Sequence, residues 1–173
     1  FTFKINSYED LWHLKQITDV YQHNKIKPII TIPCLLEAQA DDRFAENQSF
    51  GLKLVCDFLN TMEADFKIFH PHNSSTVKAL IDNVEIIDNK DFIKEVLLRI
   101  NSDNLVLLSP DAGSYKWISK LADNLEFTKE VISASKSRKW EDGHSKLTQV
   151  LDKQDFEGKD ILILDDLLIG GGS

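Results

Sequence analysis

Short apolar runs alternate along this chain with segments that have the periodicity of amphipathic helices. Four such runs, at residues 28–32, 66–69, 105–108 and 161–164, have the length and composition of buried β-strands. Strands that alternate with helices along a sequence favour parallel pairing, because each helix returns the chain to the same end of the sheet. The sequence therefore predicts an α/β fold with mostly parallel sheets flanked by helices.

The intervening segments predict the helices. Ser7 resembles an N-cap, with Asp10 three residues later, before a helix that continues to Tyr21. Further helices are predicted at 49–59, 91–100 and 115–125, and two more short strands at 1–5 and 131–133. The side chains expected to face the core are Leu11, Leu14, Ile17 and Tyr21 in the first helix, Phe50, Leu54, Phe58 and Leu59 in the second, and Phe92, Val96, Leu97 and Ile100 in the third.

The polar stretch 81–90 is the best candidate for a boundary between two α/β halves, which we place at 1–85 and 86–173. A chain of 173 residues has room for two small domains. It begins at Phe1 rather than at a methionine and stops directly after a glycine run, so we expect it to be truncated at both ends.

Charge and composition exclude several classes of function. The 20 basic and 28 acidic side chains give a net charge of −8, whereas a general nucleic-acid or membrane-surface binder needs a basic face. No apolar run approaches the roughly 20 residues that cross a bilayer. We therefore expect neither nucleic-acid nor membrane partners. Cys34 and Cys56 lie in apolar stretches without metal-ligand spacing, so we expect them to be reduced core residues of a cytoplasmic protein.

The last predicted strand runs directly into Asp165 and Asp166, and a glycine run with a terminal serine follows at 170–173. Ligands of open parallel sheets bind beyond the carboxyl ends of the strands. Carboxylates there can accept hydrogen bonds from sugar hydroxyls, while glycine N–H groups can form a nest for phosphate oxygens. The alternative is a charged turn followed by a flexible linker, but the strand and paired acids in front favour a sugar-phosphate site.

This segment resembles the phosphoribosyl-diphosphate loop of type I phosphoribosyltransferases and of ribose-phosphate pyrophosphokinases (PRPP synthetases). Their pattern is a hydrophobic strand, two acids, two apolar residues and Asp-Thr-Gly-Gly-Thr. Residues 109–113 (SPDAG) are similar to the pyrophosphokinases' Ser-Pro-Asp-x-Gly-Gly, and residues 136–138 (KSR) to their mobile Lys-x-Arg catalytic loop. Residues 70–73 (HPHN) stand where they carry Asp-x-His-Ser, and the stretch 32–42 where they carry a Pro-Tyr segment ending in Tyr-Ala-Arg-Gln-Asp-Arg. The order matches across 27–173.

The resemblance implies two phosphoribosyltransferase-like halves and an ATP-dependent diphosphokinase. Such an enzyme transfers the β,γ-diphosphoryl group of ATP to the anomeric hydroxyl of a 5-phosphoribosyl acceptor and releases AMP. It also implies Mg²⁺ as cofactor, ATP as co-substrate, a small phosphoribosyl substrate and a homo-oligomer.

Roles are implied residue by residue. The ribose hydroxyls would be bound by Asp165 and Asp166, and the 5-phosphate would be bound by Gly170, Gly171, Gly172 and Ser173. The transferring group would be contacted by Lys136 and Arg138. The nucleotide would be bound by Gln39, Asp41 and His72, and the metal by His72 and Asp111. From the residues alone, a helix N-cap is the favoured explanation of Asp111, and a solvated basic run is the favoured explanation of the two cations. A surface loop explains His72 as well as a ligand role does.

Several residues depart from the family pattern. Gln39 and Ala40 replace its Arg-Gln pair, and His70 replaces its first acid. Ile169 and Gly170 replace the Asp-Thr that grips the 5-phosphate. The loosened loop would admit an extended acceptor such as ADP-ribose. Two alternatives stay open: a type I phosphoribosyltransferase, and a non-catalytic regulatory homologue of the pyrophosphokinases.

Overall fold

The computed structural model describes the backbone of residues 1–43, 45–141, 144–150 and 156–166, and the side chains of these residues except 135–141 and 144–150. It divides into two compact units, Phe1–Asn89 and Lys90–Ser173, which are described one at a time. The boundary expected after residue 85 would cut strand β3 (Val84–Ile87), because the polar stretch contains this short strand. Among the described helices, none has both the length and the apolar character to cross a bilayer.

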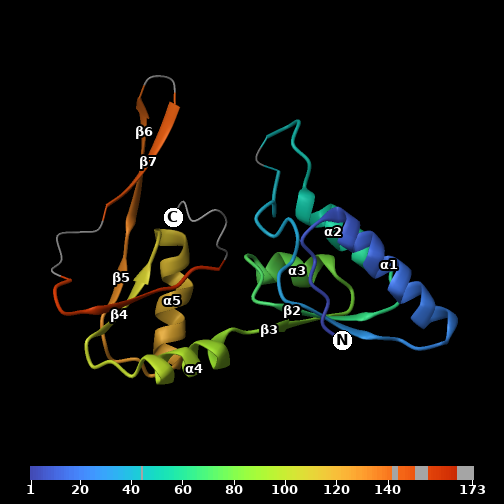
Figure 1. Cartoon of the computed structure of the whole chain (residues 1–173). Helices are drawn as coiled ribbons and strands as arrows, with labels where there is room; N and C mark the ends of the chain where they lie inside the picture. Colours follow the sequence, from blue (N-terminus) through green and yellow to red (C-terminus); the bar gives the residue numbers. More distant parts are fainter. Residues whose placement is uncertain (44, 142–143, 151–155, 167–173) are drawn as a thin grey trace. The chain divides into compact units, whose positions relative to one another are not determined.

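The first unit contains a three-stranded parallel sheet with the order β1-β2-β3. Strand β1 spans Ile29–Ile32 and β2 spans Asp65–Phe69. Helices α1 (Tyr8–His23), α2 (Gly51–Asn60) and α3 (Ser74–Leu80) lie on one side of this sheet in Figure 1. The predicted α/β fold with parallel strands and flanking helices is confirmed.

Alternation along the strands decides which face of this sheet is covered. Ile30, Ile32 and Ile68 are each 0% exposed and belong to the core beneath the helices. On the opposite face, Lys67 and Glu85 form an exposed ion pair with 2.8 Å between Nζ and Oε2. The first unit is therefore a two-layer structure, with successive strand side chains directed to opposite faces.

Helix α1 begins where the sequence predicts. Ser7 is the N-cap and forms a capping box with Asp10, in which each side chain accepts a hydrogen bond from the other residue's backbone N–H. The buried face of this helix differs from the predicted one at one position, because Thr18 is buried while Ile17 is 36% exposed. The strand expected at 1–5 is reduced to one parallel bridge, between Thr2 and Thr31.

The predicted inward faces of two helices are wrong in part. In α2 the buried side chains are Leu52, Val55, Cys56 and Leu59, whereas Leu54 is 60% exposed. In α4 (Lys90–Ile100) Ile93 is buried and Phe92 is exposed. Both helices carry apolar residues on adjacent rows, so periodicity alone does not say which row meets the sheet. Cys34, expected in the core, is exposed, while Cys56 is buried.

The second unit contains a parallel sheet with the order β5-β4-β8. Its strands are β4 (Leu105–Ser109), β5 (Val131–Ser133) and β8 (Asp160–Ile163), and its second helix is α5 (Ala112–Asn124). Leu107 is fully buried against side chains from both α4 and α5. Val106, Leu108 and Ile132 form a separate cluster, against which Phe156 packs.

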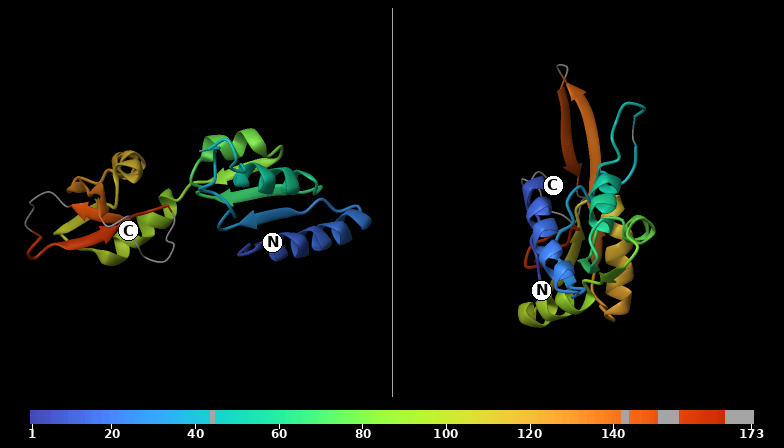
Figure 2. Two further views of the ribbon diagram at one scale, coloured as in Figure 1. Left: turned by 90° about the horizontal axis from the view of Figure 1, so that it is seen from above. Right: turned by 90° about the vertical axis from the view of Figure 1, so that its right-hand side faces the viewer.

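An antiparallel hairpin continues from β5. Strand β6 (Ser135–Glu141) pairs with β7 (His144–Val150), from Ser135 opposite Val150 to Glu141 opposite His144. Figure 2 shows the two strands running beside each other as a two-stranded ribbon. The sequence predicts a basic loop here, because the polar composition of both segments conceals their strand character.

Candidate functional site

The carboxyl ends of β4 and β8 lie side by side in the second unit. Leu108 is the register partner of Ile163, and the N–H of Leu164 donates to the carbonyl of Leu108 at 3.0 Å. The two strands are parallel, so the segments that follow them leave the sheet at the same edge. The predicted motifs at 109–113 and at 165–166 are thus brought together by strand register.

Asp111 is the N-cap of α5. Its Oδ1 accepts the backbone N–H of Ser114 at 2.9 Å, and its carbonyl accepts the hydroxyl of Ser109 at 2.6 Å. A Cβ on Gly113 would lie 3.2 Å from Asp111 Oδ1, so glycine leaves room for this carboxylate. The capping explanation of Asp111 is therefore correct as far as Oδ1 is concerned, and the metal role stays a prediction.

Ser114 links Asp111 to the acids after β8. Its hydroxyl donates to Asp165 Oδ1 at 3.1 Å, and the N–H of Asp166 donates to the same oxygen at 2.9 Å. Ser114 is not among the site residues predicted from the sequence, although it stands at the second glycine of the family's Ser-Pro-Asp-x-Gly-Gly pattern. That departure was the one available signal.

The surroundings of Asp165 raise the pKa of its carboxyl above the ordinary value. Burial is the main cause, and the neighbouring carboxyl of Asp166 adds to it, while the donors from Ser114 and the Asp166 backbone act in the opposite direction. Asp165 and Asp166 are consecutive and both half-buried, so their carboxyl groups favour hydrogen-bond donors and positive charge at this edge. A ligand hydroxyl is such a donor, and a cation supplies the positive charge.

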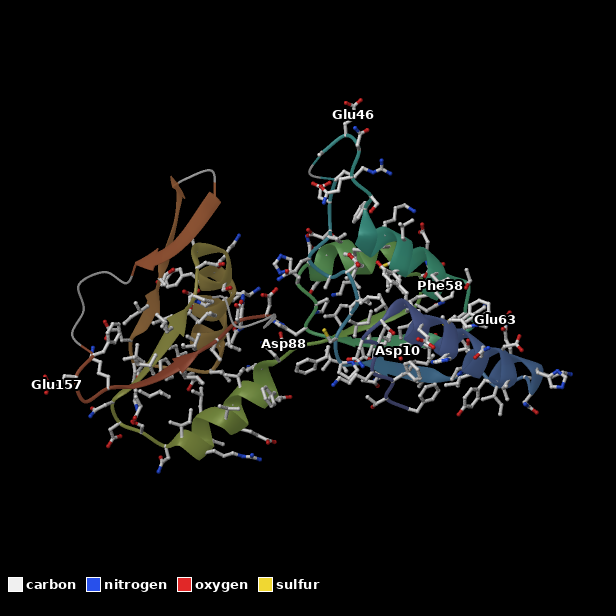
Figure 3. The ribbon with its side chains drawn as sticks, turned by 45° about the horizontal axis from the view of Figure 1, so that its top comes forward. Asp10, Glu46, Phe58, Glu63, Asp88 and Glu157 are labelled. Atoms are coloured by element: carbon white, nitrogen blue, oxygen red, sulfur yellow. The ribbon has the colours of Figure 1, made fainter. Side chains whose placement is uncertain are left out.

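In the first unit, Asn73 and Asp41 connect two of the predicted nucleotide segments. Asn73 Nδ2 donates to Asp41 Oδ2 at 2.9 Å, while Asn73 Oδ1 accepts the N–H of Thr76 and caps α3. His70, at the end of β2, has a positive φ of 34°, an uncommon conformation for a residue with a side chain. Asp88, labelled in Figure 3, comes directly after β3. Polar residues therefore follow the strands of this unit too.

The loop that carries Gln39 and Asp41 is held at both ends. The Tyr8 hydroxyl donates to Glu37 Oε1 at 2.6 Å, and the N–H of Leu52 donates to the carbonyl of Ala40 at 3.1 Å. A Cβ on Gly51 would approach Glu37 Oε2 to 2.7 Å, so only glycine fits at the start of α2 without displacing that side chain. The loop thus packs directly on the first turn of α2.

The remaining predicted site residues are placed only in part. Lys136 and Arg138 lie on β6, where their backbones pair with Gln149 and Leu147. The phosphate-binding residues 170–173, together with Ile169, lie outside the described residues. His72 belongs to the first unit and Asp111 to the second. The roles predicted for all these residues stay predictions.

Metal binding can be examined from the donors present. Across the described ranges, no group of three or more His, Cys, Asp or Glu side chains is arranged to hold a metal ion. Mg²⁺ is usually held by one or two carboxylates together with waters and substrate phosphates. The carboxylates of Asp111, Asp165 and Asp166 are metal ligands of that type, so the chemistry of this edge fits Mg²⁺ delivered with a phosphate ligand.

Comparison with known proteins identifies the family. The model of the phosphoribosyl transferase domain matches residues 77–173. The chain is 26% identical to "Ribose-phosphate pyrophosphokinase" of Sulfurisphaera tokodaii, over 92% of this chain and 53% of that protein. It is 28% identical to "Ribose-phosphate pyrophosphokinase 4" of Saccharomyces cerevisiae, over 79% of this chain and 41% of that protein.

A solved structure has the same fold. The chain superposes on the phosphoribosylpyrophosphate synthetase from Mycobacterium smegmatis with a TM-score of 0.72 and 18% identity, covering 95% of this chain and 52% of that one. This chain spans about half the length of the relatives it matches. On the family match and the shared fold, the chain belongs to the phosphoribosyl transferase domain family, in the group that resembles ribose-phosphate pyrophosphokinases.

Proposed function

We propose that this chain forms part of an ATP-dependent diphosphokinase that acts on a 5-phosphoribosyl acceptor. The observation behind the proposal is the edge of the second unit, where Asp165 and Asp166 follow β8 and are linked through Ser114 to Asp111. Relatives named ribose-phosphate pyrophosphokinase align with both units rather than with the second alone. That extent favours a pyrophosphokinase over a simple phosphoribosyltransferase.

In the proposed reaction, Asp165 and Asp166 accept hydrogen bonds from the ribose hydroxyls and orient the anomeric hydroxyl. Its oxygen attacks the β-phosphorus of ATP, the bond from that phosphorus to the α,β-bridging oxygen breaks, AMP leaves with this oxygen, and the hydroxyl proton is released. Residues 170–173 hold the 5-phosphate through backbone N–H groups. Positioning and charge stabilisation supply most of the acceleration in phosphoryl transfer.

Three further groups have proposed roles. Mg²⁺, when bound to the triphosphate, would neutralise charge on the transferring group, and Asp111 of the second unit would help to hold it. Gln39, Asp41 and His72 would bind the nucleotide, with Asp41 oriented by Asn73. Lys136 and Arg138 would stabilise the charge that develops during transfer.

The proposed acceptor includes extended molecules such as ADP-ribose. Ile169 and Gly170 stand in place of the Asp and Thr with which the family closes round a terminal 5-phosphate. A bridging phosphate has less charge than a terminal one and needs an exit path for the group attached to it. A glycine nest with an apolar neighbour suits the bridging phosphate better.

Release of AMP from ATP and Mg²⁺, measured with purified protein and either ribose 5-phosphate or ADP-ribose, tests the proposal. We expect kcat/KM for ADP-ribose at least equal to that for ribose 5-phosphate. A preference for ribose 5-phosphate of more than about tenfold, roughly 1.4 kcal/mol, would refute the extended acceptor alone. Binding of both ligands without turnover would indicate a regulatory homologue, and diphosphate release from phosphoribosyl diphosphate and a base would indicate a phosphoribosyltransferase.

Lys136→Ala separates catalysis from binding. A contact that forms mainly in the transition state affects kcat without affecting ground-state affinity. We therefore expect turnover to fall by about a hundredfold or more with KM nearly unchanged. Steady-state kinetics of the variant against Lys139→Ala, a neighbouring cation with no assigned role, would show this. A purely raised KM would contradict the role.

The proposed setting is a homo-oligomer in the cytoplasm. Both cysteines are free thiols, which is usual in a reducing compartment. The chain's net charge of −8 argues against nucleic acid and anionic membranes as partners.

A further inference from the structure

We propose that Ser114 is a positioning residue that fixes the Asp165 carboxylate for the hydroxyls of the acceptor sugar. The inference deepens the proposed function and rests on it, since it takes Asp165 as a sugar-binding residue. It concerns the geometry of the edge formed by β4, β8 and the first turn of α5. The contact that leads to it is the 3.1 Å hydrogen bond from Ser114 Oγ to Asp165 Oδ1.

Ser114 is itself held firmly. Its side chain is on the first turn of α5 and is 7% exposed. Its backbone N–H is bound at 2.9 Å by the carboxylate of Asp111, which caps the same helix. A buried hydroxyl on a capped helical turn has few orientations, so it is a rigid donor for a residue 51 positions away in the chain.

Two donors then determine the orientation of the Asp165 carboxylate. Ser114 Oγ and the N–H of Asp166 both bond to Oδ1, at 3.1 and 2.9 Å. Rotation of the carboxylate about its terminal torsion, which is otherwise broad, would break both bonds. Oδ2 is therefore held in one direction, which favours binding of a ligand hydroxyl because less freedom is lost on binding.

This hydroxyl is specific to the chain rather than part of the motif it resembles. The pyrophosphokinase pattern has glycine at the position of Ser114, and glycine offers no side-chain donor. The serine therefore adds a contact between two segments that the pattern places next to the ligand. It is the kind of substitution that adjusts affinity without changing the reaction.

Ser114→Ala is the test, with Ser119→Ala as the matched control. Ser119 lies on the same helix and its buried hydroxyl has no hydrogen-bond partner among the described residues. Affinity for ribose 5-phosphate and for ADP-ribose is measured by calorimetry, and the surroundings of the Asp165 carboxyl by its ¹³C chemical shift at one fixed pH without ligand. In Ser114→Ala we expect Kd to rise about tenfold and the Asp165 carboxyl shift to change, with neither change in Ser119→Ala.

Asp165→Ala supplies the coupling measurement, because it removes the acceptor of the Ser114 hydroxyl. If Ser114 acts through Asp165, adding Ser114→Ala to Asp165→Ala should change affinity by less than about twofold. A tenfold loss in both backgrounds, or a Ser114→Ala protein with the same ligand affinity and the same Asp165 carboxyl shift as Ser119→Ala, would overturn the inference. If Ser114→Ala does not fold, Ser114→Gly, which restores the family residue, takes its place with the same expected results.

The two proposals can fail separately. A wild-type protein that binds neither ligand would overturn the proposed function and the sugar-binding part of this inference. The contact between Ser114 and Asp165 would then still be confirmed or refuted by the carboxyl ¹³C shift of Asp165 in the two serine variants.

Discussion

In each unit, a different kind of polar contact joins two of the segments that follow the strands. In the first unit the side-chain amide of Asn73, after β2, donates to Asp41, after β1, and also caps α3. In the second unit a hydroxyl joins them, and the acceptor, Asp165, is one of two consecutive acids. The pKa of Asp165 is raised by burial. The second edge therefore concentrates half-buried negative charge, which suits a ligand rich in hydroxyls or carrying a cation.

The units also differ in how their sheets are covered. In the first, the buried residues of β1 and β2 join those of α1 and α2 in one cluster. In the second, Leu107 and its neighbours pack under α4 and α5, while Val106, Leu108 and Ile132 form a separate cluster on the opposite face. Ile163, next to Leu108, is 61% exposed. Stability in the second unit thus depends more heavily on one face.

The largest expected effect tests the acidic edge. In the double variant Asp165→Asn, Asp166→Asn, the affinity for ribose 5-phosphate should fall at least about a hundredfold, because hydrogen bonds to charged groups contribute about 1.5–3 kcal/mol each. Binding of a non-hydrolysable ATP analogue should be unchanged, since the nucleotide residues are expected in the first unit. Calorimetry of both ligands decides, and circular dichroism checks the fold. Full sugar-phosphate affinity would refute the assignment of this edge.

A core substitution tests the difference in packing. Leu107→Ala removes a side chain that is 0% exposed, and should lower the free energy of unfolding by about 3 kcal/mol. Ile163→Ala, in the neighbouring strand but 61% exposed, should cost less than about 1 kcal/mol. Chemical denaturation of both variants gives the comparison. Equal losses would mean that the exposed face is covered in the native protein.

The amide of the first unit is tested by Asn73→Ser. Serine keeps an acceptor for the N-cap of α3 but is too short to replace Nδ2 at Asp41. We expect the affinity for the ATP analogue to fall about fivefold, roughly 1 kcal/mol, with the Tm little changed. Asn24→Ser is the control, because Asn24 Nδ2 donates to the carbonyl of Val20 at the far end of α1. Equal nucleotide affinity in both variants would contradict a role for Asn73.

The smallest effect is a dependence of stability on pH. Since the folded pKa of Asp165 is raised above its ordinary value of 3.8, the native state binds this proton more tightly than the unfolded state. The contribution of Asp165 to stability is present below the ordinary value and is lost as the pH rises through the folded pKa. Asp165→Asn should therefore have a slightly higher Tm than the wild type at pH 7.

That difference should shrink as the pH falls towards 3.8. Thermal melts of the two proteins across this range measure it. A wild type that is the more stable protein at pH 7, and loses that advantage in acid, would show that the pKa of Asp165 is lowered instead.

The sequence predicted the strands and helices where their signals are local. Helix α1 begins at Ser7 because the capping box needs only residues within one turn. The strands at 29–32, 65–69, 105–109 and 160–163 were recognisable as apolar runs between polar segments. Strand β3, helix α3 and the hairpin β6–β7 were missed, because their composition is mixed and their pairing supplies the missing information.

The sequence by itself determined the α/β class, the start of α1 at its capping box, and the paired acids directly after a buried strand. The tertiary structure alone decided which row of apolar residues α2 and α4 bury, because that choice depends on the sheet beneath them. It also decided that Ser114 meets Asp165, since the parallel register of β4 and β8 sets which residues share an edge. Local periodicity fixes an element's type, but only pairing between distant segments fixes its neighbours.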